Sequence, residues 1–329
     1  MANEQGHRWL DVAAGLVLDA DGCLLLGQRP EGKSYAGWWE LPGGKLEPGE
    51  TPMQALHREL HEELGIEVTE ATPWVTYVHE YPHATVRLAF CRVTGWRGEP
   101  RGLENQALRW VDPGQPLEAL EAGLGGGHLL PATLPPVRWL QLPDRYLILP
   151  LTSPADVPGH LDRIEHALAA GVRLLQFRAP EWQGGASDGA LLDILRRTLA
   201  LTKAAGARLL VNSAHPESWW READGVQLRA ADLDRVDSRP DVGLLGASCH
   251  SRGDLARARQ LSADFALIGP VLPTATHPGH PGLGWEAFAE LNQEAGMPVL
   301  AIGGQSPATL AIARQHGAHG IAGIRHLLD

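Results

Sequence analysis

Three glutamates in the first half of the chain have a spacing that suits metal-assisted chemistry. Glu59, Glu62 and Glu63 stand at positions i, i+3 and i+4, which places all three on one face of a helix. Like charges at this spacing destabilise an isolated helix by about 0.2–0.5 kcal/mol per pair, so a bound cation is the expected compensation. Carboxylates suit Mg²⁺ or Mn²⁺, and Mg²⁺ is usually held together with substrate phosphates. The spacing therefore predicts metal-assisted chemistry on a diphosphate.

Residues 44–66 resemble a Nudix box, Gly-x5-Glu-x7-Arg-Glu-U-x-Glu-Glu-x-Gly-U with U apolar, and every fixed position is filled. The resemblance implies an α/β/α sandwich with a mixed sheet that hydrolyses a nucleoside diphosphate linked to another group. It also implies an ion pair between Arg58 and Glu50 that orients the helix. The implied metal ligands are Glu59, Glu62, Glu63 and the backbone carbonyl of Gly43, with Mg²⁺ as the metal and Mn²⁺ as a substitute.

Most of residues 10–140 look like the subgroup that converts 8-oxo-dGTP to the monophosphate and pyrophosphate and so cleans the nucleotide pool. The similarity includes residues 39–45, Arg29 and residues 98–100. It implies that Arg29, Leu41, Lys45 and Thr133 contact the substrate. Glu104 resembles the late glutamate that serves such hydrolases as a general base or extra metal ligand.

Two positions of this subgroup's base pocket differ in the present chain. Thr133 stands where an asparagine reads the purine, and a hydroxyl cannot replace both the donor pair and the acceptor of an amide. Ala84 stands near the place of an arginine that lies beside the base. A hydrolase is therefore expected, while the base that it prefers stays open.

The pattern of the first half predicts strands around one helix, whereas the second half alternates short apolar runs with helical segments. The expected strands of the first half are residues 12–18, 23–28, 74–80, 85–93 and 108–111, with a short helix at 116–122. In the second half, apolar runs recur at residues 146–151, 174–177, 207–211, 225–228, 243–248, 265–271, 298–302 and 320–324. Segments with helical spacing lie between them at residues 157–170, 191–205, 252–261 and 307–316.

Eight strands that alternate with helices predict a compact (β/α)₈ barrel of the TIM type. A doubly wound sheet is the alternative, because the connection between the third and fourth strands is short. A glycine- and proline-rich stretch, residues 123–136, precedes the barrel. We place the boundary near 135–145, with a Nudix domain at 1–138 and a barrel domain at 145–329.

From Tyr146 onward the chain resembles the thiamine phosphate synthase and TenI family. The resemblance implies a ligand site at the carboxyl ends of the strands, where barrel active sites lie. The matching positions are Gln176, Arg178, Asn212, Ser248, Thr274, Thr276, Gly303 and Gly304. Gly303 and Gly304 either cradle a phosphate or form a tight turn after a strand.

Four positions depart from the pattern of a synthase. Pro180 and His277 replace two lysines, Ser213 replaces an acid that binds Mg²⁺, and Arg325 replaces a serine, while Asp232 keeps the other acid. Loss of these partners should leave a diphosphate poorly held, so we expect no synthase activity.

TenI-type tautomerases move a proton instead, and their histidine matches His250. Two alternatives to a principal 8-oxo-dGTP diphosphatase activity therefore stay open. In one, the barrel isomerises a thiazole phosphate and the Nudix half clears thiamine diphosphate analogues. In the other, the barrel is a non-catalytic module that binds a ligand and regulates the hydrolase.

Composition limits the partners. A net charge of −11 argues against binding to nucleic-acid polymers. No apolar tract is long enough to span a bilayer, no signal peptide is visible, and Cys23, Cys91 and Cys249 are expected to be reduced thiols of a cytoplasmic protein. We expect a nucleotide substrate, a thiamine-related phosphate ligand in the barrel and no membrane; the oligomeric state is open.

Overall fold

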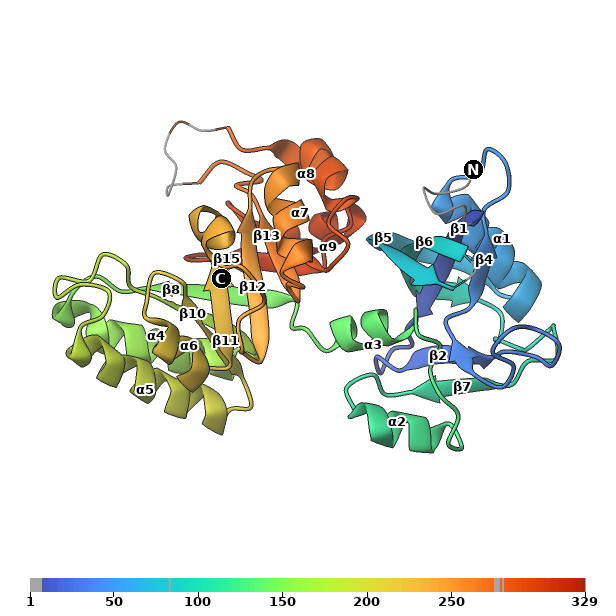
Figure 1. Ribbon diagram of the computed structural model, residues 1–329, viewed down its shortest axis with the longest axis horizontal. Helices are drawn as coiled ribbons and strands as arrows, with labels where there is room; N and C mark the ends of the chain where they lie inside the picture. The colour runs from blue at the N-terminus through green and yellow to red at the C-terminus, as the bar shows by residue number, and fades with distance from the viewer. Residues whose placement is uncertain (1–7, 83, 275–278, 280, 329) are drawn as a thin grey trace. The chain divides into compact units, whose positions relative to one another are not determined.

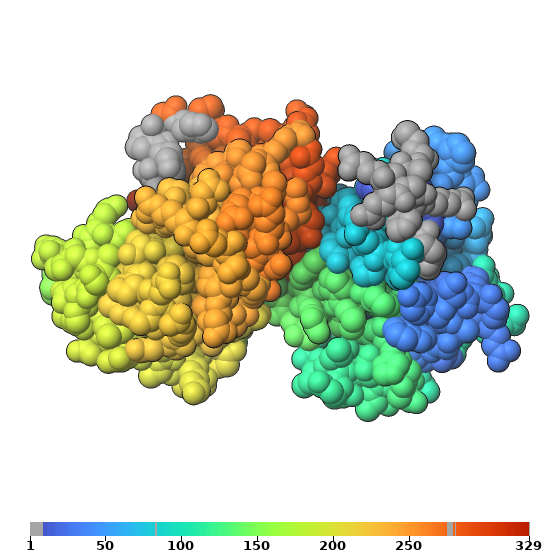
Figure 2. All heavy atoms as spheres, viewed as in Figure 1, coloured from blue at the N-terminus to red at the C-terminus, as the bar shows by residue number. Residues whose placement is uncertain are grey.

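The computed structural model describes residues 8–82, 84–274, 279 and 281–328 (Figure 1). The chain divides into two compact units, residues 1–142 and 143–329. Figure 2 shows one face of each unit with all its heavy atoms. Thr276 and His277, two positions named from the sequence, lie outside the described residues.

The first unit contains two sheets. The larger has the strand order β4-β1-β6-β5 and is mixed, because β1 runs parallel to β6 while the other neighbours are antiparallel. The smaller is antiparallel, with the order β3-β2-β7. The strands are β1 Arg8–Val17, β2 Leu24–Gln28, β3 Trp39–Glu40, β4 Gly43–Lys45, β5 Glu67–Tyr81, β6 Ala84–Arg97 and β7 Leu108–Val111. The predicted mixed sheet is confirmed.

Helix α1, Pro52–Leu64, covers one face of this unit and carries the three glutamates. It begins at a capping box. The Thr51 side chain accepts a hydrogen bond from the backbone N–H of Gln54, and the Gln54 side chain accepts one from the backbone N–H of Thr51. It ends at Gly65, whose φ of 69° is the left-handed conformation that glycine adopts without strain. Its buried residues Leu56 and Leu60 pack against β1, so the polar face of α1 is turned away from the core.

Two short helices belong to the other hydrophobic cluster of the unit, α2 Leu117–Gly123 and α3 Leu134–Leu140. Helix α2 was predicted at residues 116–122, whereas α3 was not, because it begins in the glycine- and proline-rich stretch 123–136 next to the expected domain boundary. Its two prolines, Pro135 and Pro136, stand in the first turn, where the missing N–H groups have no helical partner to lose.

The second unit is a closed barrel of eight parallel strands in the order β10-β11-β12-β13-β14-β15-β8-β9. The strands are β8 Arg145–Pro150, β9 Leu174–Arg178, β10 Arg208–Asn212, β11 Gly225–Leu228, β12 Leu244–Cys249, β13 Phe265–Ile268, β14 Val299–Ile302 and β15 Gly320–Gly323. The predicted (β/α)₈ barrel is confirmed, and the doubly wound alternative is excluded because the sheet closes.

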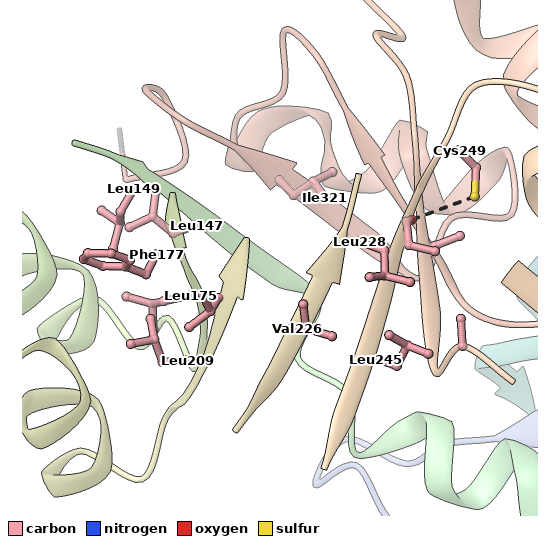
Figure 3. Packing of buried hydrophobic residues seen from close by; sticks show 14 of the residues in the cluster. Leu147, Leu149, Leu175, Phe177, Leu209, Val226, Leu228, Leu245, Cys249 and Ile321 are labelled. Carbon is pink, nitrogen blue, oxygen red and sulfur yellow. Dashed lines mark hydrogen bonds between the residues drawn. The ribbon is translucent and has the colours of Figure 1, made fainter. Parts of the chain in front are cut away.

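Helices and 3₁₀ turns connect the barrel strands. They are η1 Pro154–Asp156, α4 Val157–Ala169, α5 Gly189–Ala204, α6 Glu217–Glu222, η2 Ala230–Arg235, α7 Arg252–Gln260, α8 Gly284–Asn292, η3 Pro307–Thr309 and α9 Leu310–Gln315. Leu147, Leu149 and Phe177 belong to the apolar cluster between strands and helices (Figure 3). Ile148 and Gln176 alternate with them and line the barrel cavity. The side chains on this face of the strands can therefore contact a ligand.

The three cysteines form no disulfide; Cys91 and Cys249 are buried and Cys23 is partly exposed. Burial raises the pKa of both buried thiols to about 12. Among the described residues, no helix has the length and apolar character needed to cross a membrane.

Candidate active site

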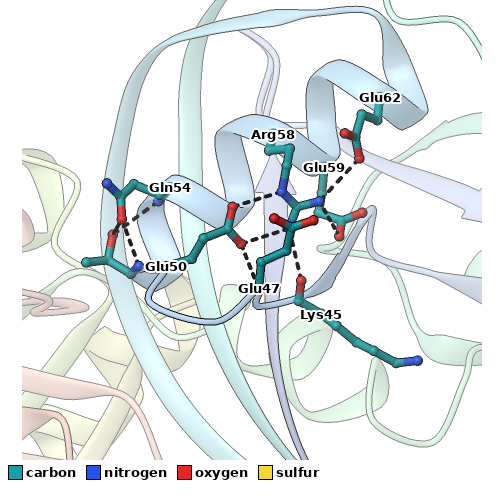
Figure 4. A network of polar contacts seen from close by, with 8 residues as sticks. Lys45, Glu47, Glu50, Gln54, Arg58, Glu59 and Glu62 are labelled. Atoms are coloured by element: carbon teal, nitrogen blue, oxygen red, sulfur yellow. Dashed lines mark hydrogen bonds and ion pairs between the residues drawn. The ribbon is translucent and has the colours of Figure 1, made fainter.

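Arg58 organises the polar face of α1 (Figure 4). Its Nε and Nη2 atoms donate to the two oxygens of Glu50 at 2.9 Å each, and Nη2 also donates to the backbone carbonyl of Lys45 at 3.0 Å. These bonds from Arg58 lower the pKa of Glu50 to about 2. The arginine thus ties the helix to the loop before it and to β4, as the motif implied.

The same arginine also reaches two of the three glutamates. Its Nη1 atom donates to Glu59 at 2.9 Å and to Glu62 at 3.2 Å, so one cationic nitrogen bridges two carboxylates. Glu63 points elsewhere and accepts the backbone N–H of Gly43 at 2.9 Å. The three glutamates share the helix, but as they stand their carboxylates do not converge on one point.

Two adjacent glycines let the backbone approach these acids. A Cβ on Gly44 would lie 2.3 Å from the carboxylate of Glu59. Gly43 has a φ of 139°, and a Cβ there would lie 2.2 Å from the carbonyl oxygen of Ala13. Gly44 therefore makes room for an acid, whereas Gly43 makes room for the neighbouring strand.

Glu104 lies in a loop that docks on the end of α1. The N–H of Leu103 donates to the carbonyl of Glu63 at 2.9 Å, and the Gln106 side chain donates to that carbonyl at 3.0 Å. The other end of the Gln106 amide accepts the N–H of Glu104 at 2.8 Å. Lys33 then bonds the Glu104 carboxylate at 2.8 Å. Gln106 and Lys33 position Glu104, and the sequence analysis identified neither.

The acids around Glu63 repel one another. Burial raises the pKa of Glu63 to about 7, and the carboxylates of Glu104, Glu40 and Glu59 push it in the same direction against the hydrogen bond from Gly43. Burial also raises the pKa of Glu40, although Arg29 opposes it. We call Glu40, Glu59, Glu63 and Glu104 the acid cluster; Arg29, Lys33 and Arg58 pair with three of these acids, and Glu63 has no cationic partner among the described residues.

A divalent cation suits this acid cluster, since its donors are carboxylate oxygens and it faces excess negative charge. Glu59, Glu63 and Glu104 are the side chains that could hold it, with Glu62 next to them. Within the described part of the chain, however, no three His, Cys, Asp or Glu side chains stand close enough to form a complete metal site. Binding would require Glu59 and Glu62 to exchange Arg58 for the cation.

A cavity of about 360 Å³ opens beside the acids. Arg29, Leu41, Lys45, Thr133 and Ala84, all named from the sequence, line it together with Glu63. Arg29 forms an ion pair with Glu40 and donates from Nε to the carbonyl of Ser34 at 2.7 Å. Thr133 is buried at the start of α3.

Tyr35 and Tyr81 also line this cavity, and the sequence analysis did not identify them. Their rings lie 5.9 Å apart, and Tyr35 has a φ of 60°. They give the cavity an aromatic wall of the kind on which a nucleobase can stack.

A second cavity, about 370 Å³, lies in the barrel. Of the positions named from the sequence, the structure brings together here Gln176, Arg178, Asn212, Ser248, His250, Thr274, Gly303, Gly304 and Arg325. His250 hydrogen-bonds through Nδ1 to the carbonyl of Gly269 at 2.8 Å. A Cβ on Gly303 would lie 2.6 Å from Pro270, so the turn itself already requires a glycine there.

Asp232 does not fit the metal ligand that the synthase resemblance implies. Arg229 donates to both of its oxygens at 2.6 and 3.1 Å, Ser213 donates at 2.7 Å, and Arg235 donates at 3.2 Å. Burial opposes the ionisation of Asp232, but these hydrogen bonds outweigh it and lower the pKa. Four donors match the roughly four lone-pair sites of a carboxylate, and Ser213 supplies no second acid.

Comparison with known proteins assigns each unit separately. Residues 13–122 match the sequence model described as the NUDIX domain, and residues 146–327 match the one described as thiamine monophosphate synthase.

Three curated proteins illustrate these similarities. Over 90 residues the chain is 47% identical to the 8-oxo-dGTP diphosphatase of Proteus vulgaris, covering 27% of this chain and 80% of that protein. It is 35% identical over 149 residues to the CTP pyrophosphohydrolase of Escherichia coli, covering 45% and 99%. It is 33% identical over 187 residues to the thiamine-phosphate synthase of Thermus thermophilus, covering 56% and 88%.

The two glycines of β4 should respond differently to alanine. Gly43→Ala should destabilise the first unit by about 3 kcal/mol, because its Cβ meets backbone in a strained conformation. Gly44→Ala should cost less than about 1 kcal/mol, because only the flexible end of Glu59 must move. Hydrogen exchange of the β1 and α1 amides measures both, and equal losses in the two variants would contradict this view of the glycines.

Proposed function

We infer the function from the two families to which this chain belongs, the NUDIX family through residues 13–122 and the thiamine monophosphate synthase family through residues 146–327. In this proposal the first unit hydrolyses a nucleoside triphosphate. The observation that supports this most is the acid cluster around Glu63, which borders a cavity with an aromatic wall. Mg²⁺ is the cation that we propose for it, with Mn²⁺ as a substitute.

Each group near the cavity has a distinct task in this proposal. When bound, the cation would screen the phosphate charge and act as a Lewis acid. Arg29 and Lys33 would attract the phosphates, and Tyr35 and Tyr81 would hold the base. Arg58 fixes the helix, and Glu104, kept in place by Gln106 and Lys33, would accept a proton from the attacking water or add a ligand to the cation.

We propose 8-oxo-dGTP as the principal substrate, cleaved to 8-oxo-dGMP and pyrophosphate, with nucleotide-pool sanitation and avoidance of DNA damage as the role. The similarity to the P. vulgaris diphosphatase supports this choice, as does a cavity whose lining includes both Arg29 and Thr133.

A pyrimidine triphosphate is the second candidate. Thr133 and Ala84 place two short side chains in the cavity where the purine-reading asparagine and arginine of the subgroup would stand. Similarity over 99% of a CTP pyrophosphohydrolase favours the same alternative.

For the barrel we propose that thiamine phosphate synthase activity is absent, because Asp232 is fully bonded to protein groups and Ser213 is not an acid. Two roles stay open, as the sequence analysis left them: proton transfer by His250 on a thiazole phosphate, and ligand binding without catalysis. In the first, the NUDIX unit would act on thiamine diphosphate analogues.

Glu62→Gln should lower kcat for 8-oxo-dGTP with Mg²⁺ by at least about 100-fold, since it removes one charge that would bind the cation. The Glu62 side chain is 57% exposed, so the variant should fold normally. Glu118→Gln, which removes an exposed acid of α2, is the matched control. Pyrophosphate release measures turnover, and an active Glu62→Gln enzyme would exclude a role for Glu62 in cation binding.

Thr133→Asn should shift base preference. A bidentate amide contact favours the purine by about tenfold or more in kcat/KM, compared with CTP. A panel of 8-oxo-dGTP, dGTP, CTP and oxidised thiamine diphosphate measures it in the wild type and the variant. An unchanged ratio would show that position 133 does not read the base, and a wild-type preference for oxidised thiamine diphosphate would favour the thiamine-related alternative.

The role of His250 is testable on the intact chain. If the barrel is a tautomerase, it should interconvert the thiazole phosphate isomers, and His250→Ala should abolish this because the proton carrier is lost. Proton NMR follows the isomers. Equal rates in both proteins would leave the barrel without this activity and favour the ligand-binding role.

A further inference from the structure

Three cations are bonded to members of the acid cluster, and one of them is held less firmly than the others. The Arg58 side chain makes five hydrogen bonds within the described residues, and that of Arg29 makes two. The Lys33 side chain has one described partner, the carboxylate of Glu104, at 2.8 Å. Lys33 is therefore the cation that can leave the acids with the least disturbance of the structure.

The ion pair between Lys33 and Glu104 is open to water on both sides. The Lys33 side chain is 48% exposed and that of Glu104 is 47% exposed. An ion pair between side chains with this exposure contributes little to stability. A ligand that binds a carboxylate more strongly than an ammonium does, such as a divalent cation, can therefore displace Lys33 from Glu104.

The loop that carries Lys33 is closed at its base by hydrogen bonds. The N–H of Arg29 donates to the carbonyl of Trp38 at 2.8 Å, and the N–H of Gly37 donates to the carbonyl of Arg29 at 2.9 Å. The flexible four-carbon stem of Lys33 can change direction while this base stays closed. Because Lys33 also lines the cavity of about 360 Å³, its ammonium can leave Glu104 and stay beside the proposed nucleotide site.

Lys33 stands in the field of three members of the acid cluster. The hydrogen bond to Glu104 is the main reason why the pKa of Lys33 is raised, and the charges of Glu63 and Glu40 raise it further, while burial opposes the rise. The ammonium thus supplies positive charge to two of the carboxylates proposed to bind the cation, Glu63 and Glu104. One ammonium does not balance both Glu104 and a phosphate, so Lys33 serves a nucleotide best after another cation has taken Glu104.

We propose that Lys33 is an exchangeable counter-ion. Without a divalent cation it neutralises Glu104, and when a cation binds Glu104 the Lys33 ammonium moves to a phosphate of the nucleotide. The proposal rests on the hydrolase function proposed above and takes Glu104 as a ligand of the cation, which is one of the two roles given to it there. Because both events share Lys33, each favours the other, so the cation and the nucleotide bind cooperatively.

Lys33→Met, which removes the charge but keeps a long side chain, should change two affinities in opposite directions. Mn²⁺ should bind the nucleotide-free chain about threefold more tightly, because its competitor for Glu104 is lost. The α,β-methylene analogue of dGTP, which resists cleavage between those two phosphates, should bind about tenfold more weakly in Mg²⁺, because a phosphate partner is lost. Electron paramagnetic resonance of free Mn²⁺ measures the first affinity and calorimetry the second, both on the intact chain.

Two further variants serve as controls. Lys33→Arg keeps the charge and should retain both wild-type affinities. Arg101→Gln removes an exposed charge that pairs with Glu99 and does not line the cavity, and it should change neither affinity.

The outcomes separate this proposal from the cation site on which it rests. An unchanged affinity for either ligand in Lys33→Met, or a loss of both affinities, would overturn the role of Lys33 and leave the cation site in place. A wild-type chain that takes up no Mn²⁺ would overturn the cation site and the role of Lys33 together.

Discussion

Crowding of carboxylates around the partly buried Glu63 is the constraint on which the site of the first unit depends. Burial is the main reason why the pKa of Glu63 is raised, and the carboxylates of Glu104, Glu40 and Glu59 raise it further. The surrounding structure keeps these acids together: the capped helix α1 supplies two of them, Gly44 admits Glu59, and the loop around Gln106 delivers Glu104. These like charges stay close because the fold imposes it, and a divalent cation is the partner that carboxylate oxygens select.

The two cavities differ in the charge of the groups around them. In the first unit, Glu40, Glu59, Glu63 and Glu104 lie close together, an arrangement for which we propose a divalent cation. In the barrel, the acid that a related synthase would give to a metal is bonded to Arg229 and Arg235, and guanidinium groups face the cavity. One chain therefore combines a hydrolase unit with an acid-rich site and a barrel cavity whose described lining contains no Asp or Glu.

Much of the barrel was predictable from sequence, because strands buried on both faces read as apolar runs. Helices α4, α5, α7 and α9 follow from their spacing, whereas α6 and α8 were not among the predicted segments. Helix α3 was not predicted because Pro135 and Pro136 are typical of an irregular segment. Prolines are nevertheless compatible with the first turn of a helix, where they stand here. The positions of Glu104 and Arg229 depend on contacts between distant segments, Gln106 with Glu63 and Ser213 with Asp232, which no local pattern encodes. The motif located the three glutamates on one helix but could not show that Arg58 bonds two of them.

Mn²⁺ titration followed by electron paramagnetic resonance tests the central claim most directly, because free and bound Mn²⁺ give different signals. The account predicts that the intact chain takes up Mn²⁺, that Mg²⁺ competes for it, and that Glu63→Gln weakens uptake at least about tenfold, as loss of one charged ligand implies. A free-ion signal unchanged by millimolar protein, or equal uptake by Glu63→Gln, would contradict the account.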